Sequence, residues 1–252
     1  MKIWLSRNGQ AYQVDLSQPM DIGIALRRGL DNPNCFWAPP FEALPVRSDS
    51  FVGDTREGGV VNFFNVRLNP HGNGTHTECV GHLTKERISI NASLPKFHYF
   101  ARVVSLLPTK APSGDRVIQR SQIEDWIHDD PTPALIIRTI PNEEWKLTAN
   151  YSGSNPPYMD KEAVELLVEA GVEHLLIDLP SVDREEDGGA LAAHRAFWRY
   201  PQDTRFEATI TELIYVPEVI KDGLYLLNLQ IAAFELDAAP SKPVIYKLEA
   251  IE

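Results

Sequence analysis

The chain has 252 residues, of which 43% are hydrophobic, and a formal net charge of −11 from 24 Lys and Arg against 35 Asp and Glu residues. A chain of this length buries enough apolar surface to fold without disulfides or a structural metal, and its acidic balance disfavours nucleic acid as a partner, which requires a basic face. Two cysteines are typical of a reducing compartment, and neither a secretory leader nor a membrane-spanning stretch is expected. We therefore expect a cytoplasmic protein with one domain over residues 1–252 and no membrane partner.

The first third of the chain is predicted to consist of strands and loops. Lys2–Ser6 and Ala11–Leu16 are expected to form a hairpin around an Asn-Gly pair, which tolerates the positive φ angles of a type I′ turn. Residues 30–50 are crowded with Asn, Pro and aromatic residues, which predicts a long ordered loop. Val60–Leu68 is predicted to be a strand covered on both faces, because its apolar residues do not alternate cleanly.

The rest of the chain is predicted to alternate strands and helices. Ser121 and Glu124 form a capping-box pattern that predicts a helix to about His128, Asp160–Ala170 is an amphipathic helix ended by a glycine, and a short helix is expected at Ala190–Trp198. Strands are predicted at Ala101–Leu107, Ala134–Thr139, His174–Leu179, Ile210–Tyr215, Leu224–Ile231 and Pro243–Leu248. This order indicates an α/β fold with a partly parallel sheet.

Three histidines and one carboxylate lie within twelve residues around a glycine-rich turn, in His71-Gly-Asn-Gly-Thr-His76-Thr-Glu78-Cys-Val-Gly-His82. Imidazole and carboxylate are ligand types that suit Zn²⁺, Mn²⁺ and Fe²⁺. The glycines let the chain turn tightly, so that the flanking side chains can converge. Thr75 and Glu78 also form a capping-box pattern, which predicts a helix from Thr75 with Glu78 and His82 on one face.

The same residues also have a structural interpretation. Glu78 can complete a helix cap, and the histidines can bond to carbonyl groups in an ordinary turn. Three histidines with a carboxylate around one turn favour a site over that interpretation. Cys79 is more typical of a small core residue than of a thiolate ligand.

The segment resembles the signature of the metal-dependent cyclase family, which includes bacterial kynurenine formamidases and isatin hydrolases. That signature is His-x-Gly-Thr-His-x-Asp-x-Pro-x-His. The Gly-Thr-His run that ends at His76 matches its centre, Glu78 stands at the Asp, and His82 stands at the last His.

The resemblance continues downstream and covers roughly residues 15–250. Leu176–Asp183 is similar to the family's strand and following loop, and His194-Arg195 is similar to its His-Arg pair. Thr211–Leu213 resembles the start of the segment that carries the family's late metal-binding acid.

This resemblance implies the swivelling β/β/α fold of the family and a divalent metal, Zn or Mn, as one ion or two. The implied metal ligands are His76, Glu78, His194 and Glu212, with Glu78 bridging if two ions are present. The resemblance further implies that His82 transfers a proton and that the chain forms a homo-oligomer.

Three positions depart from the family pattern. The first His of the signature falls on Gly72, with His71 one residue out of register. Glu78 replaces the Asp, and Val80 replaces the Pro. Two outcomes are open: His71 turns into the site, or the site holds a single ion.

The implied reaction is hydrolysis of a C–N bond in a small linear or cyclic amide, as in an arylformamidase, with an N-formyl aryl amine or a lactam as the model substrate. A metal-bound hydroxide attacks the carbonyl and His82 delivers the proton to nitrogen. The alternative is a catalytically silent family member that binds a small molecule in the same cleft. The glycine at position 72, where the signature has a histidine, supports this alternative. A purely structural metal site is disfavoured because the ligands come from distant segments.

Other candidates each have two interpretations. Asp178 and Asp183 follow a predicted strand, where open α/β sheets place ligands, although a turn-forming role fits equally well. Trp37 and Phe41 are candidates to face a planar substrate or to anchor their loop. Arg195 is a candidate to hold a substrate carboxylate or to face solvent.

Overall fold

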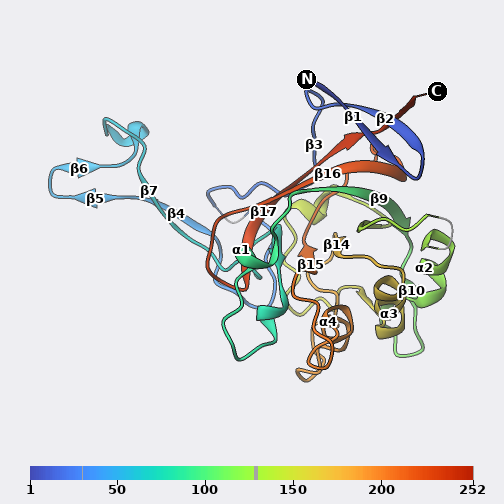
Figure 1. Ribbon diagram of the computed structural model, residues 1–252. Helices are drawn as coiled ribbons and strands as arrows, with labels where there is room; N and C mark the ends of the chain where they lie inside the picture. Colours follow the sequence, from blue (N-terminus) through green and yellow to red (C-terminus); the bar gives the residue numbers. More distant parts are fainter. Residues whose placement is uncertain (30, 128–129, 252) are drawn as a thin grey trace.

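The computed structural model describes residues 1–29, 31–127 and 130–251, and its centre is a sheet that closes on itself (Figure 1). The strands of this ring are β8 (His76–Glu78), β9 (His98–Leu106), β12 (Ala134–Thr139), β14 (His174–Ile177), β15 (Thr209–Glu212), β16 (Gly223–Ile231) and β17 (Ala238–Lys247). Their order is β16–β9–β12–β14–β15–β8–β17, and pairing of β16 with β17 completes a barrel-like ring. Strands β9, β12, β14 and β15 run parallel, which confirms the partly parallel α/β sheet.

Three helices, α2 (Arg120–Ile127), α3 (Lys161–Glu169) and α4 (Ala192–Trp198), lie side by side against one side of the ring (Figure 1). Successive residues of a strand point to opposite faces. Leu135 of β12 therefore packs in the core beneath the helices, whereas Ile136 packs in the core on the other face. Within the described residues, no helix is long and apolar enough to cross a membrane.

The boundaries of α2, α3 and α4 lie close to their predicted limits, but one predicted cap is wrong. Asp160 accepts a hydrogen bond from the backbone N–H of Ala163 and begins α3 as predicted. Helix α2 begins one residue before Ser121, and the Gln122 side chain accepts from the N–H of Gln119 instead. His128, the expected end of this helix, lies outside the described residues.

A smaller antiparallel sheet joins the two ends of the chain. In it, β1 (Lys2–Arg7) pairs with β2 (Gln10–Asp15), and β2 also pairs with β18 (Glu249–Ile251). Asn8 and Gly9 have φ angles of 50° and 81°. These positive values confirm the type I′ hairpin.

The remaining short elements connect these layers. Strand β3 (Met20–Asp21) extends the ring beside β17. The others are β10 (Thr109–Lys110), β11 (Arg116–Ile118), β13 (Tyr158–Met159), α1 (Ile90–Ser93) and the 3-10 helices η1 (Thr55–Glu57), η2 (Val80–His82) and η3 (Glu144–Leu147).

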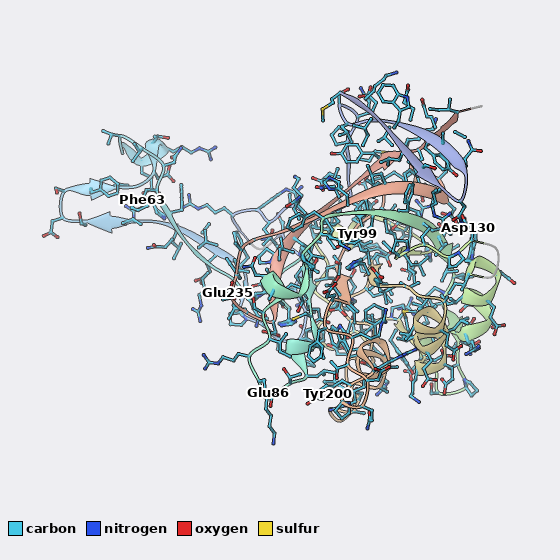
Figure 2. All side chains as sticks on the ribbon, viewed as in Figure 1. Phe63, Glu86, Tyr99, Asp130, Tyr200 and Glu235 are labelled. Atoms are coloured by element: carbon cyan, nitrogen blue, oxygen red, sulfur yellow. The ribbon has the colours of Figure 1, made fainter. Side chains whose placement is uncertain are left out.

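Residues 42–67 form an arm that projects from the body of the molecule (Figure 1). Its strands are β4 (Glu42–Pro45), β5 (Arg47–Ser48), β6 (Phe51–Val52) and β7 (Phe64–Arg67). The expectation of a strand covered on both faces is wrong here. Within the described residues, β7 pairs with β4 alone in a two-stranded ribbon, and its side chains are largely exposed. The loop expected over residues 30–50 likewise ends in two arm strands. Phe63 marks the arm in Figure 2.

Candidate metal centre

Strand β8 lies between β15 and β17 in the ring and places the side chains of His76 and Glu78 on the same face of the sheet. The two residues are two positions apart, so their side chains point the same way. Pairing with β15 places Glu212 directly opposite His76, and His76 Nε2 lies 3.5 Å from Glu212 Oε2. On the other face the hydroxyls of Thr77 and Thr211 share a hydrogen bond of 2.8 Å. Sheet register therefore joins segments that are 134 residues apart.

This strand is not the helix that the capping-box pattern predicted. Thr75 does not cap a helix, because its hydroxyl accepts from the N–H of Ile24 and donates to the carbonyl of Leu213. Strand pairing on both sides of β8 satisfies backbone groups that a helix would have bonded internally. The segment then turns through η2, which still carries His82 back toward Glu78, with 3.9 Å between His82 Nδ1 and Glu78 Oε2.

His194 comes from α4 and completes the buried cluster. Its Nε2 lies 3.0 Å from Glu78 Oε1 and 3.8 Å from Glu212 Oε1. The Asp183 carboxylate accepts hydrogen bonds from the backbone N–H groups of Ala193 and His194 and from His194 Nδ1, the last at 2.6 Å. A carboxylate on the far nitrogen of a histidine fixes its tautomer and orientation. Asp183 therefore holds His194 with Nε2 toward the cluster.

His71 also reaches this cluster, despite standing one residue out of register. Its Nδ1 lies 3.1 Å from Glu78 Oε2. Gly72 cannot carry a side chain in this loop, because a Cβ atom there would lie 2.3 Å from the Cβ of Ala38. An imidazole from position 71 thus contacts Glu78, although the family signature has its histidine one residue later.

Within the described residues, two buried atoms of the cluster make no hydrogen bond, and this supports a metal ion. His76 Nδ1 bonds to the carbonyl of Gly74, so its Nε2 carries the lone pair toward the two glutamates. His76 Nε2 and Glu78 Oε2 are buried without a hydrogen bond, which is costly unless a cation fills the space. Ligand atoms of His71, His76 and Glu78 lie within 4.8 Å of one another. The donor set suits a divalent ion such as Zn²⁺ or Mn²⁺.

We expect the metal affinity of this cluster to rise with pH. Burial alone lowers the pKa of His71, but the hydrogen bond with Asp237 and the nearby Glu78 carboxylate raise it to about 10. Burial likewise opposes charge on His194, whose pKa is nevertheless held well above its usual value by the Glu78 charge and the bond to Asp183. An ion needs the lone pair that such a proton occupies, so binding releases protons. Calorimetric zinc titrations from about pH 6 to about pH 8, in buffers of different ionisation enthalpy, should show proton release and tighter binding at higher pH. Affinity independent of pH would contradict this.

The tight packing at Gly72 gives a second expected result. Gly72→Ala should lower the free energy of unfolding by about 1–3 kcal/mol, the usual cost of overpacking, and weaken zinc binding by displacing His71. Removing the opposing methyl group in Gly72→Ala with Ala38→Gly should restore both quantities. Denaturant unfolding and zinc titration measure them, and a single variant as stable as the wild type would refute the account of this loop.

The cluster lies in a cavity of about 220 Å³. Its lining comprises Phe36, His71, Glu78, His82, Ser181, Asp183, Arg184, Glu185, Asp187, Leu191, His194 and Glu212. Sequence reasoning did not single out Phe36, Leu191 or Arg184, which lie in irregular segments without a repeating pattern. Asp237 was missed for the same reason, although its Oδ2 lies 2.9 Å from His71 Nε2.

Several weaker candidates lie elsewhere. Trp37 and Phe41 line a separate cavity of about 430 Å³, whereas the neighbouring Phe36 lines the cavity of the histidine and glutamate cluster. Asp178 is buried and forms an ion pair with Lys146, with 2.8 Å between Asp178 Oδ2 and Lys146 Nζ. It also accepts a hydrogen bond from the N–H of Thr139. Asp178 therefore has a structural role.

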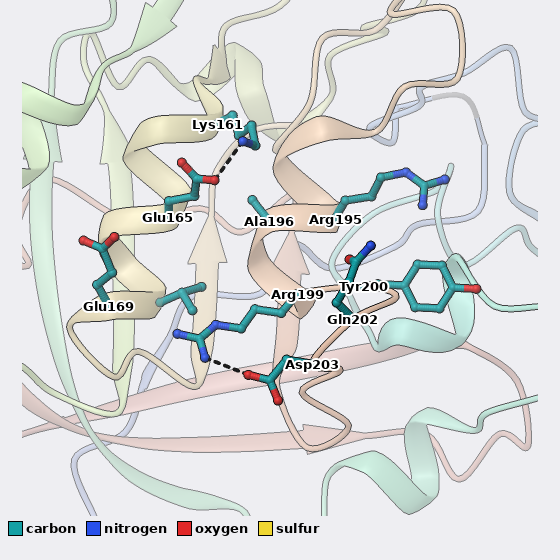
Figure 3. Close-up of a pocket in the computed structure, with 10 residues that line it drawn as sticks. Lys161, Glu165, Glu169, Arg195, Ala196, Arg199, Tyr200, Gln202 and Asp203 are labelled. Carbon is teal, nitrogen blue, oxygen red and sulfur yellow. Dashed lines mark hydrogen bonds and ion pairs between the residues drawn. The ribbon is translucent and has the colours of Figure 1, made fainter.

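Arg195 is also outside the cavity, although it follows His194 directly. Consecutive residues of a helix point about 100° apart, and Arg195 lies in the outer groove between α3 and α4 (Figure 3). Its Nε donates to the carbonyl of Ala190, and its guanidinium lies 5.7 Å from the centre of the Tyr200 ring. It is therefore not placed to hold a substrate carboxylate at the cluster.

Comparisons with known proteins find similar sequences and similar folds. The family model described as "Putative cyclase" matches residues 14–184. The kynurenine formamidase of Bacillus cereus is 23% identical over 233 residues, which cover 92% of this chain and 96% of that protein. Isatin hydrolase A from Labrenzia aggregata has the same fold, with a TM-score of 0.65 and 14% identity over 92% of this chain and 94% of that one. A predicted metal-dependent hydrolase from Bacillus stearothermophilus gives a TM-score of 0.63 at 14% identity, covering 91% and 98%. These likenesses confirm the cyclase-like fold.

Proposed function

This chain belongs to the cyclase family and is a hydrolytic enzyme, and on this premise we propose that it cleaves a C–N bond in a small linear or cyclic amide. The names of its relatives, kynurenine formamidase and isatin hydrolase, support an amide substrate. The observation that carries the proposal is the convergence of His76, Glu78, His194 and Glu212 in one cluster, in which two buried ligand-type atoms make no hydrogen bond within the described residues.

In this proposal, His76, Glu78, His194 and Glu212 hold a divalent ion, Zn²⁺ or Mn²⁺, and His71 supplies the donor that Gly72 cannot. The two oxygens of Glu78 face different histidines, Oε2 toward His71 and Oε1 toward His194, so Glu78 would serve as a ligand together with either histidine, whether one ion or two are bound. When bound, the ion would polarise the amide carbonyl and lower the pKa of a water molecule.

His82 is the proton-transfer residue of the proposal. It lines the cavity, and its side chain is 29% exposed, unlike the fully enclosed His76. A partly open imidazole beside the reacting carbonyl can exchange protons with both solvent and the leaving nitrogen. Phe36 and Leu191 give the cavity an apolar wall for the ring of an aryl amide or lactam.

A metal-removal experiment tests the proposal. Protein purified without chelator should contain about one or two equivalents of Zn, Mn or Fe and hydrolyse at least one member of a panel of N-formyl aryl amines and lactams. Dialysis against a chelator should abolish that activity, and adding back one metal should restore it. Protein that contains no metal and binds none on titration would refute the hydrolase and favour the silent binding protein. Metal-replete protein inactive on the whole panel would refute the substrate class.

We also propose that the chain forms a homo-oligomer through its arm. Leu44, Phe63 and Val66 on residues 42–67 are 56–58% exposed, and a protruding two-stranded ribbon with apolar side chains in water is unfavourable on its own. A second copy of the chain would cover these side chains.

Light scattering after size exclusion should therefore give at least twice the mass of the 28.3 kDa chain. Phe63→Ser with Val66→Ser should shift the protein to a monomer, whereas Val219→Ser, on a side chain that is 81% exposed outside the arm, should not. A wild-type monomer at micromolar concentration would contradict this.

A further inference from the structure

Asp237 lies between two histidines of the cavity and touches both with one oxygen. Its Oδ2 is 2.9 Å from His71 Nε2 and 3.3 Å from His82 Nδ1. The two imidazole rings face each other, with 4.4 Å between centroids and 33° between planes. Asp237 belongs to the segment just before β17. In the sequence it is 155 residues from His82, the nearer of the two histidines.

The fold fixes Asp237 in this place through the backbone. Ala238, the next residue, pairs with Glu78 in the ladder between β17 and β8. The carbonyl of Asp237 accepts a hydrogen bond of 3.0 Å from the N–H of Cys79. Gly81 leaves room for it, because a Cβ atom there would lie 3.1 Å from the Cβ of Asp237. The carboxylate is thus held by the same strand pairing that presents Glu78.

An ionised carboxylate only accepts hydrogen bonds, so it selects which nitrogen of each neighbouring ring carries the hydrogen. His71 must donate from Nε2 and His82 from Nδ1. In neutral rings the lone pairs are then on His71 Nδ1 and His82 Nε2. His71 Nδ1 is the atom that lies 3.1 Å from Glu78 Oε2, a separation that fits two ligands of one ion. His82 Nε2 is the atom left to move a proton.

We propose that Asp237 is a positioning residue that sets opposite tautomers in His71 and His82, so that His71 ligates metal through Nδ1 and His82 transfers protons through Nε2. The role of His82 rests on the proposed function, whereas the role of His71 needs only that the cluster binds metal. One carboxylate thereby links metal binding to proton transfer. Partners of this kind on ligand histidines commonly contribute 10- to 100-fold to metal affinity.

The test compares Asp237→Asn with Glu235→Gln, which changes a neighbouring acid on the same segment (Figure 2). Glu235 Oε1 accepts a hydrogen bond of 2.7 Å from Asn91 Nδ2. For Asp237→Asn we expect zinc binding weaker by about 10- to 100-fold in competition with a chelating dye. At saturating zinc we expect a lower kcat with little change in KM. Glu235→Gln should change none of these, and Asp237→Glu should recover part of the zinc affinity.

A second readout needs no substrate. Long-range ¹H–¹⁵N spectra of zinc-loaded, histidine-labelled protein should show His82 protonated at Nδ1 in the wild type, and Asp237→Asn should lose that preference. An Nε2-protonated His82 in the wild type, or zinc affinity and kcat within about twofold of wild type in Asp237→Asn, would overturn the proposal. If the wild type hydrolyses no amide while the tautomers and the zinc affinity behave as stated, the tautomer assignment stands and the proposed function fails.

Discussion

His76→Ala is expected to lose bound metal and amide hydrolysis together. His76 is fully buried, and its Nε2 makes no hydrogen bond with any described residue. Removing it deletes one of the donors that enclose the ion, so both metal content and turnover should fall to background. Elemental analysis and kinetics on the same preparation measure the two quantities, and circular dichroism establishes that the variant is folded.

His98→Ala is the matched control for this result. His98 lies on β9, is exposed, and bonds only to Asn228 among the described contacts. It should retain full metal content and turnover. A His76→Ala protein that keeps its metal would show that the ion binds elsewhere and would contradict the site.

His82→Ala is expected to keep the metal and lose about 10²–10⁴-fold in kcat, the usual contribution of general acid–base catalysis. The reason is exposure, because the His82 side chain is 29% exposed and contacts Asp237, whereas His76, Glu78 and His194 are buried. Kinetics at saturating metal should show the loss in kcat rather than in KM.

The opposite outcome would change the assignment of His82. If His82→Ala removes the metal as completely as His76→Ala does, His82 is a ligand and the proton donor must be another residue. Asp183 is poorly placed for that role, since both of its oxygens accept hydrogen bonds from Ala193 and His194.

Local sequence signals were sufficient where an element depends on its own residues. The helix after Asp160 has a capping side chain and an apolar face, and it forms within one residue of its predicted limits. The buried strand Ala134–Thr139 has its predicted ends, because a short apolar run that follows Pro133 and ends two residues before Pro141 has few alternatives.

Local signals failed where distant pairing decides the structure. The capping-box pattern at Thr75 is a valid helix signal, but β15 and β17 pair with His76–Glu78 from both sides and hold it as a strand. Val60–Leu68 has the composition of a covered strand, yet it lies in the arm. Tertiary context overrides propensity in both cases.

The same distinction holds for the site. Residues His76, Glu78, His194 and Glu212 could be selected because a motif names them, and the structure brings them together. Asp237 and Phe36 could not, since each is a single residue in an irregular segment. Only the register of β17 against β8 places Asp237 beside His71 and His82.

The central claim is that this cluster holds a divalent ion for amide hydrolysis, and anomalous diffraction from zinc-loaded crystals at the zinc absorption edge tests it most directly. We expect a peak about 2.0–2.3 Å from His76 Nε2 and a Glu78 oxygen, with His71 Nδ1 or His194 Nε2 completing the coordination. Zinc-loaded protein with no anomalous peak in this cavity, or with its peak at other residues, would contradict the account.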